Sequence, residues 1–233
     1  SAVARHCRAQ GRALRVLWLD AHADFNTSSL TPSGNVHGMP VAILTGHGPQ
    51  ALTQLGGETP ALRTQDFRQI GIRSVDPGEK RFVHEQGLEV FDMRHIDEVG
   101  MRRAMEQALV GLEPDTHLHV SFDVDFLDPE IAPGVGTTVP GGPTYREAQL
   151  CMEMIADTGC LASLDVMELN PALLNAQVRF ESAGSDGNFP HLYGPIPHEA
   201  VCRQMPLARD AALNWTIPPQ MGLDLTGPFK KLP

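Results

Sequence analysis

The order of short apolar runs and longer helix-forming segments constrains the fold of this chain more than any other feature. Runs typical of buried strands occupy residues 16–19, 69–72, 88–91, 117–122 and 161–167. Helices are expected at residues 2–14, 76–86, 95–112 and 145–157. Because alternating helices and strands pack as a mostly parallel sheet between helices, this pattern predicts an α/β fold with three α/β/α layers.

Composition limits both the class of protein and its partners. The chain has 233 residues, of which 42% are hydrophobic and 20% charged, as is ordinary for a folded globular protein. Its net charge of −10 includes no basic run that would attract a phosphate backbone, so we expect no nucleic acid partner. No stretch approaches the roughly 18 apolar residues of a membrane helix, so we expect no membrane partner.

The cysteines bear on the cellular compartment, and the N-terminus bears on completeness. The 4 cysteines show no C-x-x-C spacing and are too sparse for a disulfide framework. They favour a reducing compartment, so the cytoplasm is the expected location. The chain begins at Ser1 instead of a methionine, which indicates a fragment.

Acidic side chains and one histidine follow two of the expected strands. Asp20, His22 and Asp24 come directly after the run at residues 16–19, and Asp123 and Asp125 end the later run. Residues two apart in an extended chain project to the same side, and the carboxyl ends of parallel strands share one edge of the sheet. Carboxylates crowded together in this way stay ionised only if a cation neutralises them. The two motifs together predict a metal cluster.

The donor types indicate which metal this cluster would hold. Oxygen ligands with one imidazole suit Mn²⁺ better than a structural Zn²⁺ site, which favours thiolates or more histidines. Four aspartates balance the charge of two divalent ions, and such a pair lowers the pKa of a bound water enough to supply hydroxide. The alternative is that Asp20 caps a turn and Asp123 is a loop acid. The presence of both motifs at strand ends favours the metal.

Five longer motifs carry a resemblance to a known family. They occupy residues 19–27, 33–40, 70–79, 121–125 and 165–171. In order and spacing they resemble the arginase branch of the ureohydrolases, and the resemblance extends over residues 1–177. It implies an α/β/α fold and hydrolysis of L-arginine to L-ornithine and urea at a pair of Mn²⁺ ions. It also implies a homo-oligomer, a trimer or a hexamer.

The resemblance further implies a role for each motif residue. Asp20 and Asp123 would bridge the two metals, Asp24 would bind the first ion, and His22 and Asp125 would bind the second. The catalytic candidates are His37, which matches a proton-shuttling histidine, together with Asp24 and Glu168. The expected substrate contacts are Asn26 and Ser33 with the α-carboxylate, Asp76 with the α-ammonium, Thr137 in a lining loop, and Glu168 with the guanidinium, and Glu79 is a further expected substrate-binding residue.

Elementary chemistry agrees with these roles, although two of them have plainer alternatives. A guanidinium carbon is a poor electrophile, so attack needs a hydroxide and a carboxylate, such as Glu168, that holds the group in place. An imidazole suits proton delivery to a leaving amine, but His37 could equally be a loop histidine with a structural hydrogen bond. Asp76 also reads as a helix N-cap, with Glu79 in the first turn.

The sequence departs from the family at its start. The family carries a further metal-ligating histidine in a Gly-Gly-Asp-His segment, and nothing of that kind precedes Ser1. We therefore expect the N-terminal strands of the fold to be absent, with one metal bound tightly and the other weakly. We also expect the strand at residues 16–19 to have an unpaired edge.

The sequence departs from the family again after residue 177. We expect an arginase-like domain over residues 1–177 and an irregular segment of different origin over residues 178–233. Residues 189–197 are similar to the closing stretch of a small family of uncharacterised bacterial proteins. The alternative is an ordinary irregular C-terminal segment.

The sequence leaves other functions open beside arginase activity. The chain could be an agmatinase or act on another guanidino compound, and it could be a catalytically impaired fragment that serves as a binding or assembly module. A metal-dependent deacetylase of related fold is disfavoured, because it would leave the arginase-like residues 33–40 and 76–79 unexplained.

Overall fold

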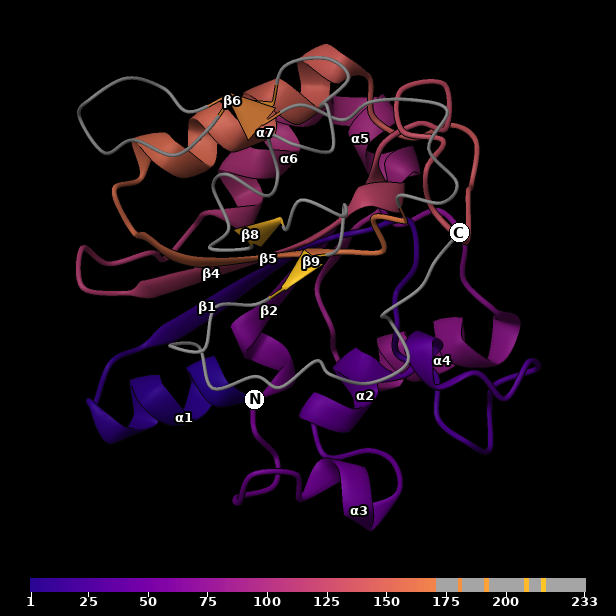
Figure 1. The fold of residues 1–233 in the computed structure, drawn as a ribbon, viewed down its shortest axis with the longest axis vertical. Coiled ribbons are helices and arrows are strands. Elements are labelled where there is room, and N and C mark those ends of the chain that lie inside the picture. Colours follow the sequence, from indigo (N-terminus) through magenta and orange to yellow (C-terminus); the bar gives the residue numbers. More distant parts are fainter. Residues whose placement is uncertain (171–179, 182–190, 193–207, 210–214, 217–233) are drawn as a thin grey trace.

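A parallel five-stranded sheet forms the centre of the protein, as seen in a computed structural model that describes residues 1–170, 180–181, 191–192, 208–209 and 215–216. The strand order is β3-β2-β1-β4-β5, and β1, β2, β4 and β5 are labelled in Figure 1. The strands are β1 (Leu14–Leu19), β2 (Phe67–Ile70), β3 (Val90–Phe91), β4 (His117–Asp123) and β5 (Leu161–Met167). All neighbours in this sheet run parallel, as the alternation of strands and helices predicts.

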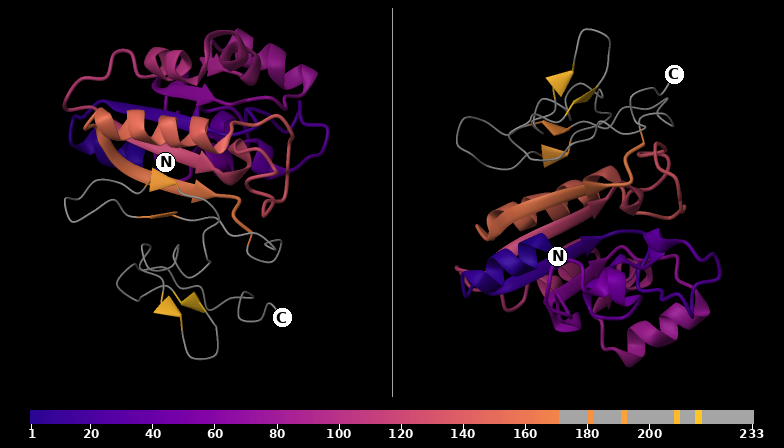
Figure 2. Two further views of the ribbon diagram at one scale, coloured as in Figure 1. Left: turned by 90° about the horizontal axis from the view of Figure 1, so that it is seen from above. Right: turned by 60° about the horizontal axis from the view of Figure 1, so that its bottom comes forward.

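Helices cover both faces of the sheet, so the expected three layers are present (Figures 1 and 2). The α-helices are α1 (Ala2–Ala9), α2 (Pro40–Leu44), α3 (Gln50–Thr53), α4 (Pro77–Glu85), α5 (Met93–Val99), α6 (Met101–Ala108) and α7 (Tyr145–Asp157). Short 3-10 turns are η1 (Val36–Gly38), η2 (Thr64–Asp66) and η3 (Val124–Phe126).

Alternation along β1 divides the core between the two layers. Leu17 and Leu19 project into a cluster built with α5, α6 and α7, whereas Val16 projects into a second cluster with α1 and α2. Successive residues of a strand face opposite sides of the sheet, so a strand buried on both faces needs apolar residues at every position.

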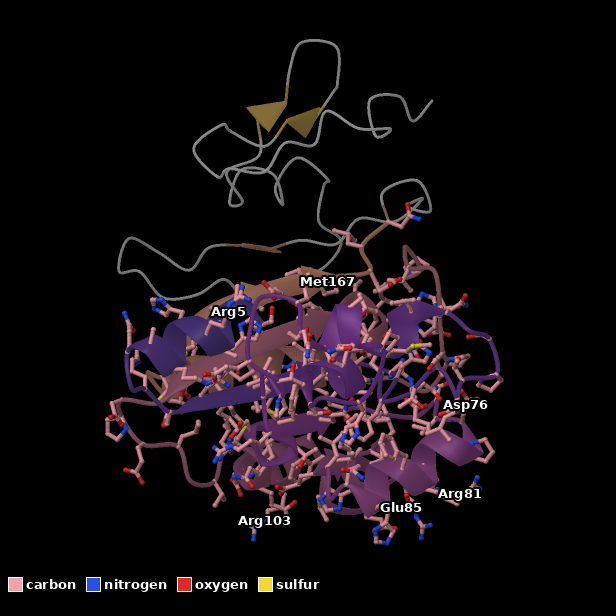
Figure 3. All side chains as sticks on the ribbon, turned by 90° about the horizontal axis from the view of Figure 1, so that it is seen from below. Arg5, Asp76, Arg81, Glu85, Arg103 and Met167 are labelled. Carbon is pink, nitrogen blue, oxygen red and sulfur yellow. The ribbon has the colours of Figure 1, made fainter. Side chains whose placement is uncertain are left out.

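Arg81 and Glu85 lie on the exposed side of α4 and point outward (Figure 3).

The expectation of an unpaired edge at β1 is wrong. Val16 pairs with Phe67 of β2 on one side, and Leu14 pairs with His117 of β4 on the other. The edge strands are β3 and β5, and partly buried and exposed residues are interleaved along β5. A hydrophobic run indicates that a strand is buried, but it does not indicate which strands lie beside it. β1 is central because β4 pairs with the side of β1 that β2 leaves open.

Two of the expected helices are shorter than the sequence indicates. The helix expected at residues 95–112 is two helices, α5 and α6, which meet at Gly100 with φ 82° and ψ 151°. That conformation is essentially restricted to glycine and ends the helix. The helix expected at residues 2–14 stops at Ala9, and Gly11 with φ 65° turns the chain into β1.

Close packing brings the ends of β2 and β4 together. A side chain on Gly71, which has φ 89°, would place its Cβ 2.4 Å from the ring of Phe126 in η3. Only glycine fits there. Because β1 runs parallel to both β2 and β4, the carboxyl ends of all three strands lie at this edge of the sheet. This edge carries the polar residues of the two aspartate motifs.

The remaining described strands are two-residue pairs beyond the sheet. Antiparallel pairs join β6 (Phe180–Glu181) with β7 (His191–Leu192), and β8 (Ala208–Arg209) with β9 (Trp215–Thr216). The expected domain boundary at residue 177, and most of residues 189–197, lie outside the described residues. No helix in the described part of the chain is long and apolar enough to span a membrane.

Candidate metal centre and substrate pocket

A cavity of about 150 Å³ opens at the carboxyl ends of the strands. Its walls come from the loops after β1, β2, β4 and β5, as expected for an open parallel sheet. The cavity is lined by Asp20, His22, Asp24, Asn26, Thr31, Ser33, His37, Gly38, Ser74, Asp76, Glu79, Asp123, Asp125, Thr137 and Glu168. Every site residue that the sequence predicts therefore lines one cavity, and Thr31, Gly38 and Ser74 are additional.

Three of the five expected metal ligands form a compact group. Ligand atoms of Asp20, His22 and Asp125 all lie within 4.8 Å of one another. Nδ1 of His22 is 3.0 Å from Oδ2 of Asp125 and 3.5 Å from Oδ1 of Asp20. The other two, Asp24 and Asp123, line the same cavity, so all five lie around one space.

The electrostatics of these carboxylates favour a bound cation. Burial, with the nearby charges of Asp20 and Asp125, raises the pKa of Asp123 to about 9. Burial also raises the pKa of Asp20 to about 6 and that of Asp24 well above its ordinary value. Carboxylates with raised pKa values become anions at neutral pH when a divalent ion supplies the missing charge. Oxygen donors with one imidazole fit a hard or borderline divalent metal such as Mn²⁺.

Neighbouring hydrogen-bond donors hold the expected ligands in place. The Asp125 carboxylate accepts from the Ala21 amide at 3.1 Å and from Oγ1 of Thr137 at 3.0 Å. The indole Nε1 of Trp18 donates to Oδ2 of Asp20 at 2.8 Å. Trp18 is not among the site residues predicted from the sequence, although its position two residues before Asp20 puts both on the same side of β1. Such partners set the orientation of metal ligands.

Two residues of the cavity have left-handed backbones. Asp24 has φ 52° and Glu168 has φ 61°, and they are the positive-φ residues other than glycine in the described chain. The carbonyl of Asp24 accepts from Val41 at the start of α2, at 3.0 Å, which holds the turn in place. Strained conformations of this kind persist where surrounding contacts impose them and are frequent at functional sites.

The expected head-group residues form a polar wall. Nδ2 of Asn26 donates to Oδ2 of Asp76 at 3.1 Å, while the buried Oδ1 of Asn26 has no hydrogen-bond partner in the structure. A buried acceptor without a partner is costly, and only a hydrogen-bond donor could satisfy this oxygen; a carboxylate would have to accept from Nδ2 of Asn26 instead. Ser33 lies on an exposed loop beside Oγ1 of Thr31, at 3.3 Å.

Glu79 is engaged by backbone amides. Only 4% of its surface is exposed, and its carboxylate accepts from Phe25 at 2.8 Å and from Asp76 at 3.3 Å. Asp76 is the N-cap of α4 and Glu79 lies in its first turn, so the helix-capping interpretation holds for this pair. Asp76 nevertheless also lines the cavity, at the start of α4 (Figure 3).

His37 lies in η1 on the exposed rim of the cavity. Among the described residues its ring has no hydrogen-bond partner. This arrangement does not support the alternative in which His37 is a loop histidine held by a structural hydrogen bond. Both ring nitrogens could therefore form a hydrogen bond with a ligand.

Comparison with known proteins identifies the family. A sequence model described as the Arginase family matches residues 1–184. This chain belongs to the arginase family. It is 46% identical over 172 residues to the arginase of Bacillus caldovelox, which covers 73% of this chain and 56% of that protein. It is 51% identical over 175 residues to the arginase of Agrobacterium fabrum, which covers 74% of this chain and 53% of that protein.

Solved arginase structures have the same fold. The crystal structure of the arginase from Bacillus cereus matches with a TM-score of 0.70 at 42% identity, over 74% of this chain and 58% of that chain. A Bacillus subtilis arginase structure matches with a TM-score of 0.67 at 44% identity, over 70% and 56% of the two chains. The chain spans about half the length of the relatives that it matches.

Proposed function

We propose that the protein hydrolyses a carbon–nitrogen bond of a linear amidine, the guanidinium group of L-arginine, to give L-ornithine and urea. The observation that carries this proposal is the single cavity that unites the expected metal ligands with the expected substrate residues. Membership of the arginase family, with relatives named arginase, supports the same reaction.

We propose Mn²⁺ as the metal and Asp20, His22, Asp24, Asp123 and Asp125 as its ligands. When bound, a Mn²⁺ pair would supply a hydroxide nucleophile near neutral pH. His22 and His37 are the histidines that line the cavity in the described chain, and His37 lies on its rim. In this assignment His22 binds one of the two ions, so the other ion has only carboxylate ligands among the proposed residues. We therefore expect one ion to bind tightly and the other weakly.

The remaining residues bind and orient the substrate. The Glu168 carboxylate pairs with the guanidinium and holds its carbon close to the carboxylate cluster. Asn26 and Ser33 contact the α-carboxylate and Asp76 accepts from the α-ammonium, while Glu79 holds that wall of the cavity. His37 delivers a proton to the departing amine, as its exposed position allows.

The quaternary state and location are also proposals. We propose a homo-oligomer, a trimer or a hexamer, because the family resemblance implies one. Cys7, Cys151 and Cys160 are buried free thiols, which is consistent with a reducing compartment such as the cytoplasm.

The proposed reaction is tested by urea release after incubation with Mn²⁺. We expect urea from L-arginine and little from agmatine, because agmatine lacks the carboxylate that Asn26 and Ser33 would contact. Metal analysis of the same sample gives the stoichiometry. Urea from agmatine alone would identify an agmatinase instead, and bound metal without any turnover would indicate a binding or assembly module.

A further inference from the structure

The guanidinium of Arg73, just beyond β2, makes an unusual set of contacts. It donates only to backbone carbonyls, and no ion pair joins it to a carboxylate of the described residues. The acceptors are Val139 at 2.7 and 3.1 Å, Asp125 at 2.8 Å, Phe126 at 3.0 Å, Leu127 at 3.2 Å and Gly71 at 3.2 Å. The carbonyls of residues 125–127 and of Val139 lie 52 to 66 positions from Arg73 in the sequence, and that of Gly71 lies two positions away.

Two of these contacts adjoin the proposed metal centre. Asp125 carries one of the compact group of ligand atoms, and Val139 lies two residues after Thr137, whose hydroxyl donates to the Asp125 carboxylate at 3.0 Å. The backbone amide of Arg73 also donates to the carbonyl of Ala21 at 2.8 Å. Arg73 thus contacts the loop after β1, the loop after β4 and the segment that carries Thr137.

The guanidinium occupies a space shaped for it. A Cβ on Gly142 would lie 2.6 Å from Nη2 of Arg73 and 2.7 Å from the amide nitrogen of Asp128. The Asp128 carboxylate accepts from the amides of Gly141 and Gly142, at 2.9 and 3.1 Å, and closes the same loop. Residues 125–142 therefore fold around the Arg73 side chain.

We propose that Arg73 is a positioning residue that holds the Asp125 carboxylate against Asp20 and His22 by fixing the backbone carbonyls of residues 125–127. The inference rests on the proposed metal site. The planar fork of arginine can reach several carbonyls at once, whereas a lysine ammonium is a single point with three donors. Replacing the Arg73 guanidinium would leave residues 125–142 less firmly held, without removing any proposed metal ligand.

The test compares Arg73→Lys with the matched control Arg15→Lys in the full chain. Nη1 of Arg15 also donates only to carbonyls, of Ala108 at 3.3 Å and Val110 at 3.2 Å, at the opposite end of β1. Mn²⁺ alone is titrated calorimetrically, and melting temperatures are measured in parallel. We expect Arg73→Lys to weaken Mn²⁺ binding about 10- to 100-fold, the range for residues that orient metal ligands, and Arg15→Lys to bind like the original protein.

The outcomes separate this inference from the proposed function. If the original protein binds no Mn²⁺, the proposed metal centre itself is wrong. If it binds Mn²⁺ and Arg73→Lys binds equally well, or if both variants lose affinity equally, the positioning role is wrong. Circular dichroism verifies that each variant folds. If Arg73→Lys does not fold, Arg73→Gln, which also has fewer donors than arginine, takes its place. Weaker Mn²⁺ binding by Arg73→Gln would then support the positioning role, and unchanged binding would contradict it.

Discussion

Two N–H groups hold the carboxylate of Asp20 in place. The Trp18 indole donates to Oδ2 at 2.8 Å, and the His22 amide donates to Oδ1 at 2.6 Å. The carboxylate is buried, so its orientation depends on these partners and not on water. At the scale of single residues, the orientation of Asp20 therefore depends on the backbone of His22, which lines the cavity, and on the indole of Trp18, which is not among the lining residues.

Replacing Trp18 with phenylalanine tests this arrangement. We expect Trp18→Phe to weaken Mn²⁺ binding about tenfold, because it removes the indole donor and keeps a ring against Phe67. Mn²⁺ titration gives the affinity. Phe67→Leu is the control, since it disturbs the ring packing but removes no hydrogen bond. Unchanged affinity in Trp18→Phe would show that the indole does not orient Asp20.

Two glycines at the ends of elements serve different purposes. Gly100 ends α5 and starts α6, and a Cβ there would meet nothing within 4 Å. Gly71 has a similar φ, but a Cβ there would meet the Phe126 ring. The first glycine is needed for its backbone conformation alone, whereas the second is also needed for the approach of β2 to η3.

The two glycines give a matched pair of substitutions. We expect Gly100→Ala to reduce the free energy of unfolding by about 1–3 kcal/mol, the cost of the backbone strain. Gly71→Ala should cost more, because it adds overpacking against Phe126, and it should also weaken Mn²⁺ binding. Urea denaturation measures the first effect and Mn²⁺ titration the second. If Gly100→Ala lost more stability than Gly71→Ala, the added methyl group at residue 71 would not be overpacked against Phe126.

The stability of the whole molecule should depend on pH because Asp123 and His22, which line the cavity, have raised pKa values in the folded protein. Without metal, burial and the neighbouring aspartates raise the pKa of Asp123 to about 9. Burial lowers the pKa of His22, but the carboxylates of Asp125 and Asp20 raise it to about 10. Both values exceed the ordinary ones, 3.8 for aspartate and 6.5 for histidine. The native state therefore binds more protons than the unfolded chain above pH 6.5.

The sign of the pH dependence follows from this difference. A native state that binds extra protons loses stability as the pH rises, so we expect the melting temperature in EDTA to fall between pH 6.5 and 9. Added Mn²⁺ should reduce the fall, because the ion replaces the protons. Thermal melts across this pH range, with and without Mn²⁺, measure both effects. A melting temperature that rises with pH in EDTA would contradict the proposed charge cluster.

Much of the fold and of the candidate site could be predicted because the signals are local. The apolar runs that became β1 and β4 have the composition of strands buried on both faces, and the residues that follow them alternate with period two. Asp20, His22 and Asp24 are predicted from three positions of one segment. The convergence of this segment with Asp123 follows from the shared edge of a parallel sheet.

Local sequence patterns were enough to predict the layered α/β class and the strand ends that carry acids, and the family resemblance added most of the other residues that line the cavity. Only the folded chain shows that β1 lies between β2 and β4, that the Trp18 indole donates to Asp20 and that the Arg73 guanidinium donates to the carbonyls of residues 125–127 and 139. Arg73 and Asp125 are 52 positions apart, and no periodicity connects them. Composition and spacing report local preference and burial, whereas strand order and long-range hydrogen bonds depend on how the whole chain closes on itself.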